Sequence, residues 1–433
     1  MAFINDRIQE INVPPELQIF ECEANQAAVQ KIYTESIRPV TNFGNSDSDI
    51  LFHVPNSGQD YVDLRHSRLR IKCKIVKGDG GAIKSKTDHV GPINNIVNSL
   101  WNQVEIFFNG TLVSDTSPHY TFKAYLKRLL TRGKGDDRAE GFFADDQDFD
   151  DGNSVSGTNG GLLVRSTLFT DSTEVELEAP LIEGVMTIDK FLLNRIDVQI
   201  KLHMNESKFL LMSDEGGASY RFQLIDIMFR VCKVKVDQAL QLTNEQTLIS
   251  RPAVYCYDAT NVNTLSIPSG SSSFSWNNIF QNSIPEHLVI VMLSQSAYLG
   301  SYSRNPFKFQ SFNLSDVNLY INGELWNGES MRMSPAVFLN HWKECSKRWS
   351  ARMDNSDLNL FDYKTGNTML AFPIKPINRL KQKMIGLINS GVLSLEITFK
   401  TATTENITCL AFGDFQCMLE ISQDRRVKIY QYA

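Results

Sequence analysis

Alternation of apolar and polar residues is the dominant pattern along the chain. In residues 68–77 (RLRIKCKIVK) every second residue is apolar, and residues 195–204 (RIDVQIKLHM) and 393–400 (LSLEITFK) repeat this pattern. Successive side chains of a strand point to opposite faces of its sheet, so a period of two predicts strands with one buried and one solvated face. Turn-forming clusters such as 77–81 (KGDGG) and 268–273 (PSGSSS) separate these stretches. The pattern predicts an all-β protein built from antiparallel sandwiches.

Helical spacing of apolar residues is rare. It occurs after Pro118, over residues 119–130 (HYTFKAYLKRLL), and again after Pro335, over residues 336–348 (AVFLNHWKECSKR). In the first stretch the aromatic and leucine residues share one side, and Lys123, Lys127 and Arg128 occupy the other. We expect two short amphipathic helices whose charged sides face water.

A short motif occurs twice. Residues 104–110 read VEIFFNG and residues 317–323 read VNLYING, and in each half the motif is followed by one of the two prolines and its helix. Asn-Gly readily takes the positive φ angles of a tight turn between antiparallel strands. A second pair of similar stretches begins at Phe222 and Phe415. A repeat this long predicts a duplicated domain of many short strands, and hence two tandem jelly-roll domains with short helices in their connecting loops.

Single cores stop growing at roughly 250 to 300 residues, so a chain of 433 residues is expected to fold as two domains. We predict an N-terminal arm over residues 1–29, a first jelly roll over 30–240 and a second over 250–433. The connection is expected within residues 238–250. The acidic and then Gly/Ser-rich stretch 133–161 is predicted to be an exposed surface loop inserted into the first copy.

Composition narrows the classes of function. The net charge of −6 gives no electrostatic footprint for nucleic acid, and the longest apolar run, LVIVML at 288–293, is far too short for a membrane span. The start, MAFINDRIQE, has no apolar signal-peptide core, and the seven cysteines form no C-x-x-C pair. We expect a soluble intracellular protein with reduced cysteines, each buried in a core.

Candidate chemistry is sparse. No two of the seven histidines lie within ten residues, so no local metal motif exists, although ligands from distant strands remain an alternative. Asp146, Asp148 and Asp150 stand at the first three ligand positions of a calcium loop, but Asp151 and Gly157 replace the Gly and Glu that such a loop needs. Motifs of nucleophilic hydrolases and phosphate-binding loops are absent from the sequence. We therefore expect no catalytic, cofactor-binding or metal site.

Four segments together resemble a known family. Residues 60–77, 90–115, 120–133 and 303–324 are similar, in order and spacing, to double jelly-roll major capsid proteins, in particular those of Polinton/Maverick elements and adintoviruses, relatives of the adenovirus hexon. The family usually carries a Pro-Tyr-Arg-Ala-Tyr-like run in the first helix, whereas this chain has TFKAY at 121–125. This departure leaves the fold unaffected and the subgroup undetermined.

The resemblance implies a major capsid protein rather than an enzyme. Such a subunit forms homotrimers that act as pseudo-hexameric capsomers and build an icosahedral shell around a DNA genome, with penton and minor capsid proteins as further partners. It would be located in the virion, without specific nucleic-acid binding or a membrane span. Two alternatives from other classes are a carbohydrate-binding β-sandwich protein and a two-sandwich hydrolase.

Two segments are candidates for subunit contacts. Residues 271–280 (SSSFSWNNIF) place Phe274, Trp276, Ile279 and Phe280 in a loop-like stretch, and apolar residues in such a place often mark an interface. The N-terminal arm lacks strand alternation and is expected to lie along a neighbouring subunit.

Overall fold

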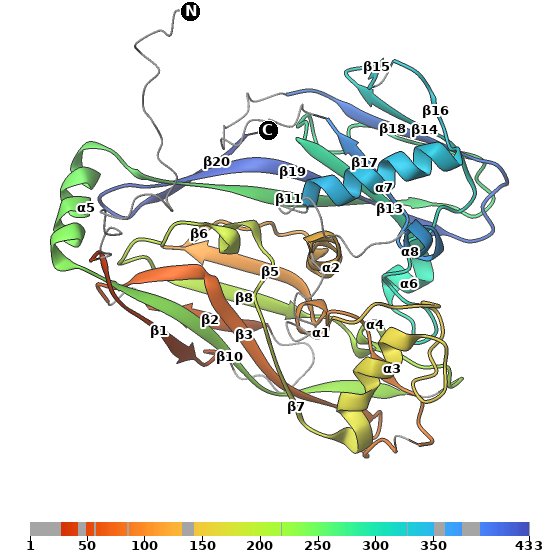
Figure 1. Ribbon diagram of the computed structural model, residues 1–433, viewed down its shortest axis with the longest axis horizontal. Helices are drawn as coiled ribbons and strands as arrows, with labels where there is room; N and C mark the ends of the chain where they lie inside the picture. Colours follow the sequence, from red (N-terminus) through yellow and green to blue (C-terminus); the bar gives the residue numbers. More distant parts are fainter. Residues whose placement is uncertain are drawn as a thin grey trace, which may run out of the picture.

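The computed structural model describes residues 27–41, 49–55, 58–84, 86–131, 143–217, 219–326, 328–349, 360–374 and 390–432. Within these ranges the chain is mostly β-structure, arranged in four large antiparallel sheets and a small two-stranded one (Figure 1). The arm predicted for residues 1–29 lies outside the described ranges except for its last three residues.

The first half of the chain forms two sheets. Sheet 1 consists, in spatial order, of β1 (Val29–Ile37), β10 (Tyr220–Val236), β3 (Tyr61–Lys77) and β7 (Val175–Ala179). Sheet 2 consists of β2 (Ile50–Val54), β8 (Val198–Met204), β5 (Trp101–Phe108) and β6 (Thr111–Leu112). The small sheet pairs β4 (Gly91–Pro92) with β9 (Leu211–Met212).

The second half repeats this order of strands. Sheet 3 consists of β11 (Ala253–Ile267), β19 (Ile407–Ile421), β13 (His287–Ser294) and β17 (Met369–Pro373), with β20 (Val427–Tyr432) beside β19. Sheet 4 consists of β12 (Ser273–Trp276), β18 (Leu393–Phe399), β14 (Leu314–Ile321) and β15 (Glu324–Leu325), with β16 (Met331–Arg332) beside β14. Sheets 1 and 3, and sheets 2 and 4, are therefore equivalent strand by strand.

Short helices connect the strands. The first half contains α1 (Ile96–Ser99), α2 (Tyr120–Thr131), α3 (Gly160–Ser166), α4 (Ser207–Leu210) and the 3-10 helices η2 (Thr167–Ser172) and η3 (Gly184–Thr187). The second half contains α6 (Gln295–Leu299), α7 (Pro335–Trp349) and α8 (Leu360–Thr365). The helix α5 (Gln238–Ser250) connects β10 to β11 at one end of the molecule (Figure 1). The two helices predicted after Pro118 and Pro335 are α2 and α7.

The alternating stretches form the strands that their pattern predicts. On β3 the inward residues Leu69, Ile71, Cys73 and Ile75 are all fully buried. Both Asn-Gly motifs form left-handed turns, with φ angles of 47° and 78° at Asn109 and Gly110, and 52° and 85° in the second copy. These turns join β5 to β6 and β14 to β15, so the predicted equivalence of the two motifs is confirmed.

The predicted match between the stretches that begin at Phe222 and Phe415 pairs equivalent strands, but these two residues do not occupy equivalent positions in them. Phe222 lies near the start of β10, paired with Ile75 of β3, whereas Phe415 lies in the middle of β19, paired with Ala259 of β11. Both strands are central in their sheets, which explains their similar composition. Apolar alternation identifies equivalent strands, but it does not fix the register between them.

The apolar stretch 271–280 is not the exposed loop that was predicted as a subunit contact. Its first part is strand β12, and Trp276, Ile279 and Phe280 are buried in the core between sheets 3 and 4. The ring of Phe280 contacts Phe415 edge-on, with 5.4 Å between ring centroids. The polar serines around these residues suggested a loop, but they lie on the outward side of a short edge strand. The expectation that every cysteine is buried also fails, because Cys256 is exposed.

Candidate functional site

Helix α2 lies at the contact between the two halves of the chain (Figure 1). The ring of Tyr125 stacks on Phe307, with 3.9 Å between ring centroids and an interplanar angle of 6°. Phe122 meets Phe307 edge-on and stacks on Tyr298. Stacked and edge-on rings each stabilise by about 0.5–1.5 kcal/mol beyond their buried area. The apolar side of α2 thus packs against the second half.

The charged side of α2 is also buried, which corrects the expectation that it faces water. Lys123 is only 5% exposed and forms an ion pair of 2.6 Å with the buried carboxylate of Glu183. Burial raises the pKa of Glu183 and lowers the pKa of Lys127. The helix is enclosed because two sandwiches pack around it. An amphipathic pattern predicts one buried side of a helix, and it does not show whether a second neighbour also covers the polar side.

His119, just before α2, joins the same region. Its Nε2 lies 3.1 Å from the hydroxyl oxygen of Tyr298, and burial lowers its pKa to about 4. The imidazole is therefore neutral near pH 7. Its role in this arrangement is to pack and hydrogen-bond across the contact between the halves.

The acidic segment predicted as a solvated loop is anchored in the structure from residue 143 onward. Asp146 and Arg165 form an ion pair of 2.6 Å in which neither side chain is exposed. The amide of Asn305, from the second half, donates a further hydrogen bond of 3.1 Å to Asp146. Phe143 and Phe149 are buried as well. The prediction of an exposed excursion is wrong for this part; residues 132–142 lie outside the described ranges.

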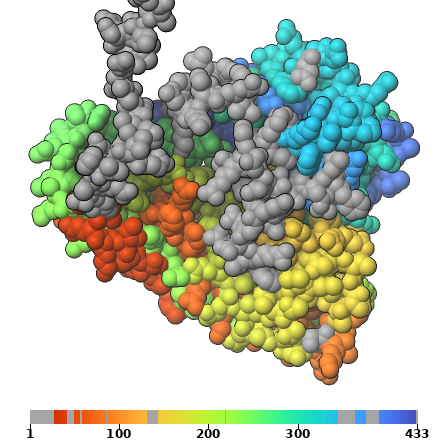
Figure 2. All heavy atoms as spheres, in the orientation of Figure 1, coloured from red at the N-terminus to blue at the C-terminus, as the bar shows by residue number. Residues whose placement is uncertain are grey.

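A second carboxylate of this segment binds two cations of the second half. Asp150 lies 2.6 Å from the amine of Lys308 and 3.3 Å from the guanidinium of Arg304, and it accepts the backbone N–H of Asn305 at 3.1 Å. Figure 2 shows the residues around 150–185, in yellow, forming part of the compact surface of the first half. Two of the three aspartates that resemble the start of a calcium loop, Asp146 and Asp150, thus connect the two halves. No local signal marks the basic partners of Asp150, which lie more than 150 residues away in the sequence.

Further contacts extend along the junction between the halves. The hydroxyl of Tyr257 donates to the carbonyl of Val113 at 3.1 Å. At Gly184 the backbones are so close that an added Cβ would lie 2.2 Å from the carbonyl oxygen of Asp258. The side chain of Asn109, in the first Asn-Gly turn, donates to the carbonyl of Arg425 at 2.8 Å. We call the face of the first half that makes these contacts, around α2 and η3, the α2 side.

The outward face of sheet 1, which points away from the core of its own sandwich, is rich in charged residues. Residues of β3 and β10 carry positive charges that pair with glutamates on β7 or just before it: Arg70 with Glu176, Lys72 with Glu174 and Arg230 with Glu178. These side chains are between 33% and 51% exposed. We call this surface the charged face of sheet 1.

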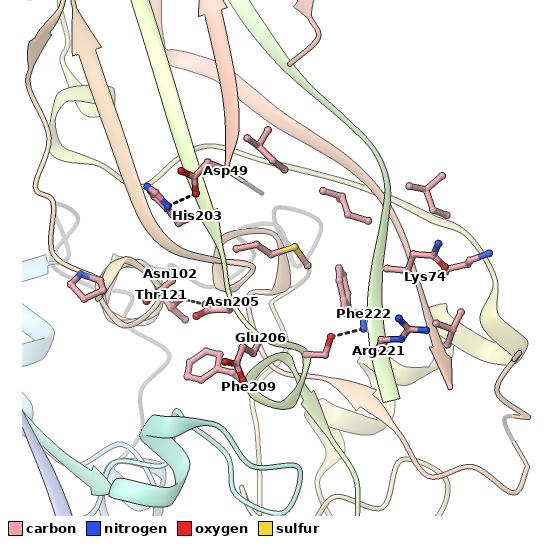
Figure 3. A pocket seen from close by; sticks show the side chains of 18 of the residues that line it. Asp49, Lys74, Asn102, Thr121, His203, Asn205, Glu206, Phe209, Arg221 and Phe222 are labelled. Atoms are coloured by element: carbon pink, nitrogen blue, oxygen red, sulfur yellow. Dashed lines mark hydrogen bonds and ion pairs between the residues drawn. The ribbon is translucent and has the colours of Figure 1, made fainter. Parts of the chain in front are cut away.

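A groove of about 1430 Å³ opens between sheets 1 and 2 (Figure 3). Its apolar walls include Phe209, Phe222 and Leu224. At its rim Asp49 contacts both Lys201 and His203, at 2.9 and 2.7 Å, and the hydrogen bond to Lys201 lowers the pKa of this carboxyl despite partial burial. In Figure 3 the dashed lines mark the contact between Asp49 and His203 and the hydrogen bond from Asn205 to Thr121.

Within the described ranges, no three His, Cys, Asp or Glu residues are grouped so that they would hold a metal ion. The histidines instead pair with carboxylates or pack, as His66 does with Asp63 at 2.7 Å. No described helix is long and apolar enough to cross a membrane.

Comparison with known proteins gives a likeness to capsid structures over the whole chain. No protein-family model matches. A protein of Caenorhabditis elegans described as "Uncharacterized protein F54H12.2" is 23% identical over 383 residues, which cover 84% of this chain and 89% of that protein.

Among solved structures, the mavirus major capsid protein matches with a TM-score of 0.58 and 12% identity, covering 100% of this chain and 96% of that one. A chain of the Sputnik virophage structure matches with a TM-score of 0.59 and 11% identity, covering 100% and 93%. The Faustovirus major capsid protein matches with 0.54 and 9%, covering 96% and 94%. The chain has the double jelly-roll fold of these major capsid proteins.

Proposed function

We propose that the protein is a major capsid protein, a structural subunit whose homotrimers act as pseudo-hexameric capsomers of an icosahedral shell around a DNA genome. The observation that carries this proposal is the tandem pair of equivalent sandwiches, which matches solved major capsid proteins over nearly the full length of both chains. A trimer of such chains presents six similar sandwiches, so a threefold object has a nearly sixfold outline.

The junction between the halves supports this proposal. A shell subunit must hold its two sandwiches in one fixed orientation, because each sandwich contacts different neighbours. The stacked pair Tyr125–Phe307 and the hydrogen bond from the Asn305 amide to Asp146 fix that orientation through packing and directional hydrogen bonding. A flexible linker between independent domains would lack both.

An enzymatic or carbohydrate-binding role receives less support. Sugar-binding sandwiches use exposed aromatic platforms, whereas Trp101 is fully buried and Trp276 is only 7% exposed. The histidines and carboxylates at the rim of the groove pair with one another, as Asp49 does with His203. We therefore propose a non-enzymatic role in the virion, in which penton and minor capsid proteins bind the assembled trimers.

Electron microscopy of the purified protein tests the proposal. At micromolar concentration we expect uniform particles with a threefold, nearly hexagonal outline, and shells or flat arrays of these particles under assembly conditions. Single particles of one chain, without threefold symmetry at any concentration, would contradict it.

A further inference from the structure

Helix α5, which connects the two halves, exposes large apolar residues. Leu240, Leu242 and Ile249 are 38%, 60% and 69% exposed. Three of the ten exposed large hydrophobic residues in the described part of the chain therefore lie on this helix of 13 residues. Single exposed apolar side chains are common on protein surfaces, whereas several of them on one short element mark a candidate binding surface.

A different side of α5 attaches the helix to the fold. Gln241 donates to the carbonyl of Val236, and Asn244 donates to the hydroxyl of Tyr61, both at 2.9 Å. Leu248, one turn beyond Asn244, is buried. Residues three and four apart share one side of a helix, so these three positions define the inward side of α5.

Leu242 and Ile249 share another side of the helix, which faces solvent. They are seven residues apart, which is two turns or about 10 Å along the axis. Glu245, the one charged residue in the sequence of α5, is paired with Arg425. We call Leu242 and Ile249 the α5 stripe. Covering the stripe buries apolar surface without removing an unpaired charge from water.

The N-terminal segment, residues 1–26, joins the described chain at the first turn of α5. The carbonyl of Ala28 accepts the backbone N–H of Asp237 at 2.9 Å, and the side-chain amide of Gln30 donates to the carboxylate of Asp237 at 3.1 Å. Asp237 is the N-cap residue of α5. The point at which the N-terminal segment enters the fold is therefore directly beside the helix that carries the α5 stripe.

The composition and the length of the N-terminal segment both suit this surface. Residues 8–20 (IQEINVPPELQIF) contain six large apolar residues. A stretch of 26 residues spans at most about 85 Å when fully extended. Ile249 lies only about 18 Å along the helix from its N-cap, so the segment is long enough to reach the whole stripe of its own chain.

We infer that residues 8–20 bind the α5 stripe of the same chain. The tether makes its own segment the preferred occupant, because a short covalent connection gives an effective concentration of roughly millimolar. A second copy at micromolar concentration competes poorly with such a segment. This contact lies within one chain, whereas the sequence alone suggested that the N-terminal arm lies along a neighbouring subunit.

Hydrogen exchange of the full-length protein tests the inference. We expect the backbone amides of residues 8–20 to exchange at least tenfold more slowly than those of a free peptide of the same sequence. Leu242→Gln combined with Ile249→Gln should remove this protection, because the substitutions take the apolar surface away from the stripe. The control Thr243→Gln changes an exposed residue on a different side of the same helix and should leave the protection unchanged.

Two outcomes of this experiment would overturn the inference. One is exchange of residues 8–20 at the rate of the free peptide in the unaltered chain. The other is protection that persists in the double variant. Both altered positions are exposed and Gln is a good helix former, so far-UV circular dichroism should confirm that the variant is folded.

Photo-crosslinking distinguishes the same chain from a second copy. A benzophenone amino acid replaces Leu242 in the full-length chain, and a control carries it at Thr243. After illumination, mass measurement under denaturing conditions separates crosslinks within one chain from those between two chains, and peptide mapping locates them. We expect a product with the mass of one chain, joined to residues 8–20, at least fivefold more abundant from position 242 than from 243. A product with the mass of two chains, or no crosslink to residues 8–20, would overturn the inference and leave the proposed function standing.

Discussion

Sheets 1 and 3 occupy equivalent places in their sandwiches, yet their second faces have opposite chemistry. On sheet 1 that face carries the cross-strand neighbours Lys72 and Glu176, whereas on sheet 3 the equivalent strands carry Val289 and Ala371 on that face. Both sheets use their other face for the core of their own sandwich. The difference shows that duplication fixed the strand order, while the neighbour of each sheet determined the residues on its second face.

A substitution that gives sheet 3 the chemistry of sheet 1 should have the largest effect. Val289→Lys places an amine in the apolar junction, and desolvation without a partner should cost more than about 4 kcal/mol of unfolding free energy. The matched Lys72→Val on sheet 1 should leave the free energy of unfolding nearly unchanged. Chemical denaturation measures both, and similar losses at the two positions would show that the faces do not differ as described.

The second-largest effect should be the difference in stability lost when a buried and an exposed ion pair are broken. Asp146→Ala leaves the Arg165 guanidinium buried without its carboxylate, so we expect a loss of about 3–5 kcal/mol. Glu174→Ala, which breaks the exposed pair with Lys72, should leave the free energy of unfolding nearly unchanged. If Asp146→Ala melted like the unaltered chain, the segment would be a solvated loop after all.

The junction should also lose stability in acid. Because the pKa of His119 is lowered to about 4 in the folded chain, the unfolded chain takes up the proton first as the pH falls below 6.5. Between pH 6.5 and 4 this should remove up to about 3 kcal/mol of unfolding free energy. The variant His119→Gln should show a flatter pH dependence over that range. Parallel curves for His119→Gln and the unaltered chain would contradict this assignment.

Smaller and equal losses should come from the two Asn-Gly turns, where the halves are alike. Gly110→Ala and Gly323→Ala each force an alanine to a positive φ, at a cost of about 1–2 kcal/mol. Space does not limit either substitution, since an added Cβ meets nothing within 4 Å at both positions. Unequal losses, measured by thermal unfolding, would show that the turns are not equivalent.

The sequence was sufficient for the strands, for both helices and for the equivalence of the Asn-Gly turns, because each depends on local periodicity or local φ angles. It failed where the outcome depended on packing between distant segments. Lys123 on α2 and Asp146 in the acidic segment are residue types that are usually solvated, yet each is buried in an ion pair with a residue distant in the sequence, Glu183 and Arg165. The prediction for residues 271–280 was wrong in the opposite sense, since it gave an exposed loop where the structure has an edge strand and buried residues. A short strand rich in serine resembles a loop. The domain boundaries remain a prediction, with α5 at the predicted connection.

Native mass spectrometry of the full-length protein across dilution tests the central claim most directly. We predict a species of three chains, each of 49.0 kDa, that persists to nanomolar concentration, because obligate interfaces typically bury roughly 2,000 Å² or more. A single species near 49.0 kDa at every concentration would contradict the assignment of this chain as a capsid subunit.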